Sequence, residues 1–291
     1  MAMSRAEQML YCATKITTYS DGKPVQTGTG FFYVVHLAAE DKSRDLHIFV
    51  TNKHVLQGAD RVSISFHQGN GGSLHPGEFT PLFLDLKPEA LVNHPDPDVD
   101  LCAFPLGQAI AIMAALGRPL FWVSLDKNAI PSDEQWGTLD AIEKITMVGC
   151  PNGLFDEANN MPIARSGTTA TDIAKRYQGR SEFLIDLACF PGSSGSPVFV
   201  YDTNGGFDRG SSEFTVGRVK LYFVGVLYAG PVITNTGEIQ LAKGPTFAFG
   251  SMMHLGQVIR ATEVLAFDQW AHDADSKGLI GSTSHSNVRV D

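Results

Sequence analysis

The 291-residue chain has no excess of positive charge and no hydrophobic run long enough to cross a membrane. Its formal net charge is -9 at pH 7, and no basic stripe offsets it, which argues against a nucleic-acid-binding protein. Internal repeats and low-complexity blocks are also absent. The N-terminus shows neither the apolar segment nor the cleavage site of a secretory signal peptide. We therefore expect neither a nucleic acid nor a membrane as partner.

Cysteine is scarce as well. The chain contains Cys12, Cys102, Cys150 and Cys189, of which the last three lie inside apparent strands and are interpreted as buried small hydrophobic residues. This usage predicts a cytoplasmic protein without disulfides.

The chain does contain many short apolar runs, broken by 29 glycines and 15 prolines. Such punctuation is typical of an all-β protein with many short strands. With 43% hydrophobic residues, a chain of this length can bury one full core or two small ones.

The segment Phe190–Pro197 is the most informative part of the sequence, because it has the pattern G-x-S-G-x-P between two apolar runs. A serine hydroxyl becomes an effective nucleophile only when a neighbouring base takes its proton. Gly192 carries no Cβ, so its N–H and the N–H of Ser194 can together face a developing oxyanion. The pattern predicts Ser194 as the nucleophile. The alternative is a simple glycine- and serine-rich turn between strands.

A nucleophilic serine needs a histidine, and that histidine needs an orienting carboxylate. An apolar strand ends at His54, which makes this histidine the candidate base. Asp100 directly precedes the apolar strand Leu101–Phe104, so its side chain can turn inward toward the histidine. Asp96 and Asp98 are the rival carboxylates, and we expect them on a loop.

These segments resemble the trypsin-like serine peptidases, in which the catalytic residues follow the chain order His, Asp, Ser. The resemblance covers about residues 10–250. It is closest to bacterial trypsin-like peptidases, including the protease domain of the high-temperature-requirement (HtrA) group. The other segments that carry it are Thr27–Phe32, Ile145–Leu154, Phe183–Ala188, Val224–Gly230 and Gly244–Phe249.

The resemblance implies an all-β fold of two six-stranded antiparallel β-barrels followed by a C-terminal helix. Residues 10–116 are expected to form the first barrel, 117–140 the crossover and 141–250 the second barrel. Apolar spacing predicts an amphipathic helix over 251–272 and a polar tail over 273–291. It also makes Gln108–Leu116 a candidate short helix.

The resemblance further implies a serine endopeptidase that acts on a polypeptide through an acyl-enzyme intermediate, with no cofactor and no metal. His54 is expected to act as general base and then acid, while Asp100 fixes its tautomer. Ser193 stands where secreted trypsins carry the aspartate that pairs with a new N-terminus, so a regulatory protein partner stays open. The alternative function is a catalytically inactive or partner-regulated module that captures peptides on the same fold.

The resemblance also places Ala188 at the base of the specificity pocket, where a neutral residue cannot offset the desolvation of a buried cation. The other expected substrate-binding residues are Tyr228, Gly230, Thr246 and Phe247. We expect cleavage after small or medium uncharged residues. Asp186 shares a strand face with Ala188, which leaves a preference for basic residues as the alternative.

Overall fold

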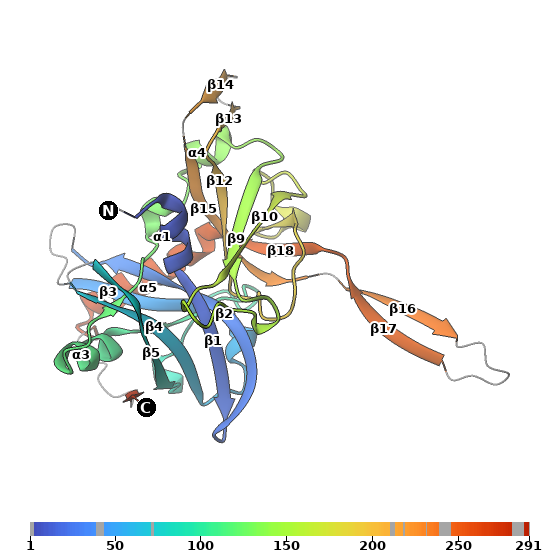
Figure 1. The fold of residues 1–291 in the computed structure, drawn as a ribbon. Helices are drawn as coiled ribbons and strands as arrows, with labels where there is room; N and C mark the ends of the chain where they lie inside the picture. Colours follow the sequence, from blue (N-terminus) through green and yellow to red (C-terminus); the bar gives the residue numbers. More distant parts are fainter. Residues whose placement is uncertain are drawn as a thin grey trace.

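The computed structural model describes residues 3–38, 44–70, 73–209, 213–217, 219–230, 232–238, 246–280 and 288–290. These residues are mostly strands, with helices at the edges of the molecule (Figure 1). The helices are α1 (Arg5–Tyr11), α2 (Lys53–Leu56), α3 (Gly107–Ala115), α4 (Asp133–Thr138) and α5 (Leu265–Ser276). The helix α3 confirms the short helix expected at Gln108–Leu116. None of the helices in these ranges has the length and hydrophobicity needed to span a bilayer.

The N-terminal half forms a nine-stranded sheet. Its strands are β1 (Ala13–Ser20), β2 (Lys23–His36), β3 (Asp45–Thr51), β4 (Arg61–Asn70), β5 (Ser73–Asp85), β6 (Val92–Asn93), β7 (Cys102–Pro105), β8 (Leu120–Phe121) and β19 (Val288–Val290). They follow the order β19-β5-β4-β1-β2-β3-β7-β6, and β8 pairs with β4. The sheet pairing does not close this half into a ring among the described residues.

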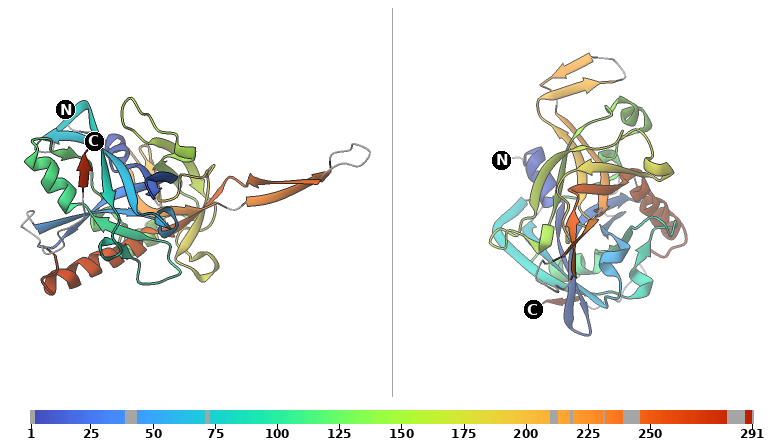
Figure 2. Two further views of the ribbon diagram at one scale, coloured as in Figure 1. Left: turned by 90° about the horizontal axis from the view of Figure 1, so that it is seen from below. Right: turned by 90° about the vertical axis from the view of Figure 1, so that its right-hand side faces the viewer.

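The C-terminal half is a closed six-stranded barrel, as the resemblance predicts for this half. Its strands are β9 (Lys144–Gly149), β10 (Ile163–Thr169), β11 (Glu182–Asp186), β12 (Pro197–Asp202), β15 (Lys220–Ala229) and β18 (Leu255–Arg260). Two further hairpins, β13–β14 (Gly205–Asp208 and Glu213–Val216) and β16–β17 (Val232–Glu238 and Thr246–Met252), form sheets of their own. Both hairpins project from the body of the molecule (Figures 1 and 2).

The structure corrects the predicted C-terminal helix. Residues 255–260 form β18, which completes the barrel between β11 and β15, and the helix α5 begins only at Leu265. The apolar residues of this segment fit both a helical period and the alternation of a strand whose inner side is buried. The expected polar tail also differs, because Asp273 still lies in α5 and Val288–Val290 pairs with β5.

Each half has its own apolar core, and a third cluster joins them. Phe49 and Phe66 belong to the core of the N-terminal sheet, whereas Phe183 lies in the core of the barrel. Phe31 from β2 packs edge-on against Phe223 from β15, with ring centroids 5.3 Å apart, in the cluster between the halves. The halves are therefore packed against each other by buried aromatic side chains.

Candidate active site

His54 and Asp100 form a hydrogen-bonded pair at one end of the N-terminal sheet. His54 lies on α2, directly after β3, and its Nδ1 is 2.5 Å from Asp100 Oδ2. The His54 backbone N–H also donates to Asp100 Oδ1 at 3.1 Å, and the Asn52 amide donates to the Asp100 carbonyl at 2.7 Å. A carboxylate can only accept, so the proton belongs on Nδ1 and Nε2 is left as the basic nitrogen.

The rival carboxylates make other contacts. Asp96 Oδ1 accepts a hydrogen bond from the Asp98 N–H within their loop, and the Lys53 ammonium donates to the Asp96 carbonyl. The structure thus brings Asp100 to His54 and keeps the other two acids on the loop, as the position of Asp100 before its strand predicts.

The absence of a side chain at Gly28 lets α2 pack closely against β2. A Cβ added at Gly28 would lie 2.6 Å from a methyl group of Val55, which is too close for any side chain. Val55 is buried on α2 directly after His54. The glycine therefore fixes how closely the histidine-bearing helix packs on the sheet.

Ser194 lies in the tight loop between β11 and β12. Gly192 and Gly195 have φ values of +83° and +87°, a region that favours glycine. A Cβ at Gly195 would meet the Thr29 carbonyl oxygen at 1.9 Å, so the space also requires glycine. The Ser194 hydroxyl donates to the Tyr228 carbonyl at 3.4 Å.

Ser194 and His54 line one cleft of about 480 Å³. Gln26, Thr27, Val55, Asn152, Pro191 and Gly192 line it with them. No hydrogen bond joins Ser194 to His54 within the described ranges. Catalytic hydrogen bonds are often long or misaligned without substrate.

The N–H groups of Gly192 and Ser194 donate no hydrogen bond to any described residue. The Pro191 carbonyl accepts from the Asn152 N–H at 2.6 Å. In a trans peptide the carbonyl and the following N–H point in opposite directions, so this bond turns the Gly192 N–H away from Asn152. Two free donors beside a serine can stabilise an oxyanion.

Thr29 holds the same loop from the other half of the molecule. Its hydroxyl donates to the Gly192 carbonyl at 2.9 Å and accepts from the Cys150 N–H at 2.9 Å. Its backbone N–H donates to the Ser194 carbonyl at 2.9 Å. Ser193 is fully buried, and its hydroxyl has no partner among the described residues. Neutral hydrogen bonds from Thr29 therefore hold the loop, and no buried charge pair in the described ranges takes part.

The sequence predicts Thr29 only as part of a family segment, whereas the structure shows its hydrogen bonds to the serine loop. The local sequence signal for this role is a threonine between two glycines, Gly28 and Gly30. The glycines leave room for another backbone segment to approach the threonine hydroxyl. Asn152 was missed as well, because its hydrogen bond to the Pro191 carbonyl joins residues far apart in sequence.

Two predicted pocket residues lie near the serine loop. The Tyr228 hydroxyl donates to Glu182 Oε2 at 2.9 Å, and burial raises the pKa of Tyr228. A Cβ at Gly230 would lie 3.6 Å from the Cys189 side chain. Ala188 is half-buried directly before Cys189. Asp186 is exposed, which places its carboxylate on the outside of the barrel.

The backbone of Thr246 and Phe247, the two residues predicted to wall the pocket, lies outside the barrel. Both lie on β17, where Thr246 pairs with Glu238 and Phe247 pairs with Gly237. This strand belongs to the hairpin that extends away from the barrel (Figures 1 and 2). β17 pairs with β16 instead of joining the barrel, and β18 takes the place beside β15.

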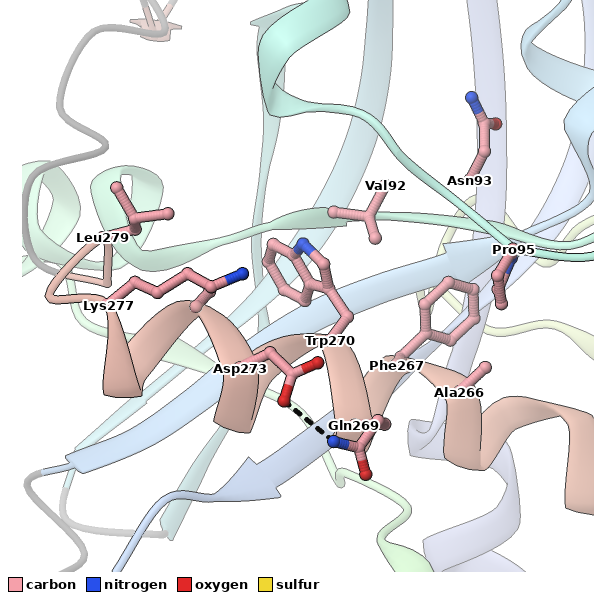
Figure 3. A pocket seen from close by; sticks show the side chains of 11 residues that line it. Val92, Asn93, Pro95, Ala266, Phe267, Gln269, Trp270, Asp273, Lys277 and Leu279 are labelled. Carbon is pink, nitrogen blue, oxygen red and sulfur yellow. Dashed lines mark hydrogen bonds between the residues drawn. The ribbon is translucent and has the colours of Figure 1, made fainter.

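A hollow of about 540 Å³ lies elsewhere, between α5 and the segment around β6 (Figure 3). Val92, Phe267 and Trp270 line it with mainly apolar atoms. Neither His54, Asp100 nor Ser194 reaches this hollow, so it is separate from the candidate active site.

The sequence matches the trypsin-like peptidase domain over residues 28–205, which is more than half of the chain and includes His54, Asp100 and Ser194. The chain therefore belongs to the trypsin-like peptidase family. This confirms the general resemblance, whereas the closeness to the HtrA group stays a prediction. No curated protein matches the sequence.

Three solved structures illustrate the likeness. A thermostable serine protease AL20 from an extremophilic microorganism is 12% identical, with a TM-score of 0.42 over 91% of this chain and 98% of that one. HL collagenase is 15% identical, with a TM-score of 0.44 over 93% and 94% of the two chains. The MamO protease domain from Magnetospirillum magneticum is 9% identical, with a TM-score of 0.38 over 90% and 98%.

Proposed function

We propose that this protein is a serine endopeptidase that cleaves polypeptides through Ser194, His54 and Asp100. The observation that supports this most is the pairing of His54 with Asp100 in a cleft that also contains Ser194 and two free backbone donors. A peptidase of this family needs all of these groups.

In the proposed reaction, Ser194 Oγ attacks the scissile carbonyl while His54 Nε2 takes the hydroxyl proton. The Gly192 and Ser194 N–H groups bind the oxyanion that forms. His54 then gives its proton to the leaving amine, and a water molecule activated by His54 hydrolyses the acyl-enzyme. Asp100 holds the ring orientation and stabilises the imidazolium in both steps.

A fluorophosphonate probe, which modifies only an activated serine, tests the proposal. We expect labelling of the wild type and none of Ser194→Ala, with peptide hydrolysis lowered about 10⁴-fold or more. Asp100→Asn should lower turnover about 10³- to 10⁴-fold, whereas Asp98→Asn, the matched control, should leave it nearly unchanged. A larger loss in Asp98→Asn would contradict the assignment of Asp100.

The second candidate is a catalytically inactive or partner-regulated module that captures peptide strands. The hydrogen bond from the Ser194 hydroxyl to the Tyr228 carbonyl, rather than to His54, favours it. An inactive module would bind peptides without labelling by the probe. A protein switched on by a partner would be labelled only after that partner is added.

We also propose a cytoplasmic location. All four cysteines are buried thiols without disulfides, which fits a reducing compartment.

A further inference from the structure

Arg165 lies on β10 with its side chain directed into the six-stranded barrel. It pairs with Met147 across the β9–β10 ladder, and Met147 is buried in the barrel core. Directly opposed residues of an antiparallel ladder place their side chains on the same face. The neighbours Ala164 and Ser166 are exposed, as alternation requires. Arg165 therefore brings a permanent positive charge to an otherwise apolar barrel interior.

The guanidinium lies beside the loop that carries Ser194. Its Cζ is 5.2 Å from the centre of the Phe190 ring, and Phe190 directly precedes Pro191, which lines the Ser194 cleft. Burial raises the pKa of the Cys189 thiol to about 11, and the charge of Arg165 offsets part of that shift. The arginine thus lies close to the residues between Ala188, at the expected pocket base, and Ser194.

This charge has no counter-ion in the described part of the chain. Arg165 Nη1 is buried and has no hydrogen-bond partner there. On the neighbouring strand β11, Glu182 accepts from the Tyr228 hydroxyl and Asp186 is exposed outside the barrel. Arg165 as a whole is half-buried, but a buried guanidinium nitrogen without an acceptor is unfavourable, and a carboxylate from a ligand supplies both the acceptor and the opposite charge.

A second group that can carry positive charge lies at the same ring. The His254 imidazole contacts Phe190 edge-on, with ring centroids 6.3 Å apart, and its side chain is exposed. Phe190 is thus flanked by Arg165 and His254, and neither is an anion. The charge around this ring favours an acidic group and disfavours a basic one.

We propose that Arg165 is a specificity-determining residue that binds the side-chain carboxylate of Asp or Glu at the position whose carbonyl Ser194 attacks. This inference rests on the proposed peptidase function. The proposed acidic preference replaces the preference for uncharged residues that Ala188 predicts. The small Ala188 side chain leaves space in the pocket, and Arg165 supplies a positive charge for the substrate carboxylate.

Four peptide substrates that differ only at the cleaved position, with Glu, Gln, Ala or Lys, test the proposal. Gln matches Glu in shape and lacks only the charge. We expect the wild type to hydrolyse the Glu substrate with a kcat/KM about 10- to 100-fold higher than the Gln substrate, as for a hydrogen bond to a charged group. The Lys substrate should be the poorest of the four.

Three variants identify the residue responsible. Arg165→Met, which keeps the length of the side chain, should lower kcat/KM for the Glu substrate about 10- to 100-fold and leave the Ala substrate nearly unchanged. Arg165→Lys should keep part of the Glu preference. Arg176→Met, at an exposed arginine outside the barrel, is the matched control and should keep all of it.

Fluorophosphonate labelling separates this inference from the proposed function, because the probe does not depend on the cleaved side chain. A labelled wild type that prefers Gln, Ala or Lys overturns the inference and leaves the peptidase function standing. A Glu preference that survives Arg165→Met in a folded protein overturns the role of Arg165. Absence of both labelling and hydrolysis overturns both proposals. If Arg165→Met does not fold, the wild-type order of the four substrates and the Glu preference of Arg165→Lys test the proposal instead.

Discussion

Hydrogen bonds from Thr29 and Asn152 hold the carbonyls of three residues in the Ser194 loop. The Pro191, Gly192 and Ser194 carbonyls accept from the Asn152 N–H, the Thr29 hydroxyl and the Thr29 N–H. Each of these bonds ties a loop carbonyl to the body of the protein, while the Gly192 and Ser194 N–H groups keep no acceptor among the described residues. Thr29 is therefore a positioning residue for the proposed oxyanion donors, and the hydrogen bonds that hold the loop involve no charged group.

Thr29→Val tests this role with a change of almost no volume. The variant loses the bond to the Gly192 carbonyl and leaves the buried Cys150 N–H without an acceptor, a cost of about 1–3 kcal/mol in the free energy of unfolding. We expect kcat to fall about 10- to 100-fold with little change in KM, because the oxyanion donors act in the transition state. Steady-state kinetics and urea unfolding measure the two effects.

Thr29→Ser should restore kcat, because the hydroxyl alone makes these bonds. Thr14→Val is the matched control: Thr14 is also buried on the same sheet, and its hydroxyl has no partner in the described part of the chain. Equal losses of kcat in Thr14→Val and Thr29→Val would mean that threonine on this sheet matters only for stability.

Local pattern predicted His54, Asp100 and Ser194 together, and the structure pairs His54 with Asp100 and places Ser194 in the same cleft as His54. Each lies beside an apolar strand or in a glycine-rich turn, where its chemistry restricts the sequence around it. The position of Arg165 could not be predicted in this way, since it depends on the pairing of β10 with β9 and on Phe190, 25 positions further along the chain. Sequence alone does not report which of two strand faces becomes the inside of a barrel.

At the scale of elements, a part-buried hydrogen bond attaches the C-terminal helix α5 to the N-terminal sheet. The Tyr33 hydroxyl, on β2, donates to Asp268 Oδ2 at 2.6 Å. Burial raises the pKa of Asp268, and the Tyr33 hydrogen bond and the charge of Lys127 offset only part of the shift. The helix therefore carries a carboxylate that is more costly to ionise in the folded than in the unfolded protein.

The raised pKa of Asp268 determines how the free energy of unfolding depends on pH. A group whose pKa is raised on folding contributes stability that is fully present below its unfolded value, about 4 for an aspartate, and that is lost as pH rises through the folded value. Asp268→Asn keeps an acceptor for Tyr33 and removes the ionisation. We expect the variant to gain stability relative to the wild type as pH rises from 4 to 7, measured by urea unfolding.

Asp273→Asn provides the control on the same helix, because Asp273 is exposed and its carboxylate accepts only from Gln269 among the described residues. Its difference from the wild type should stay flat over this range. A flat profile for Asp268→Asn as well would show that the Asp268 carboxyl titrates alike in the folded and unfolded chain.

The elements themselves were predictable in unequal measure. The strands around the site follow from short apolar runs, and α3 follows from a run without strand alternation. The segment 251–272 was predicted to be wholly helical, because Leu255, Val258 and Ile259 fit a helical period as well as a strand. Pairing with β11 and β15, which only the tertiary structure supplies, decides in favour of a strand.

At the scale of the whole molecule, the cluster between the halves makes the site depend on both. His54 and Asp100 come from the N-terminal sheet, and Ser194 comes from the barrel. Phe31 and Val50 of the sheet share one buried cluster with Phe223 of the barrel. Since the halves have separate cores but also this common one, their relative position is set by apolar packing as well as by the Thr29 hydrogen bonds.

Phe223→Ala tests whether the halves unfold as one unit. The side chain is fully buried between Phe31 and Phe199, so its removal should cost about 3–5 kcal/mol. Trp122, which stacks on Phe32, reports on the N-terminal half, and Trp136 reports on the barrel core. With the other tryptophans replaced by Phe, both reporters should show the same urea midpoint in the wild type.

In Phe223→Ala the two midpoints should fall together, because the cluster that Phe223 fills belongs to both halves. Ile142→Ala, at a side chain that is 69% exposed, is the control and should leave both midpoints unchanged. A lower midpoint for Trp136 alone would mean that the barrel unfolds independently. The His54–Ser194 cleft would then be lost while the N-terminal sheet stays folded, and activity would follow the Trp136 transition instead of a common one.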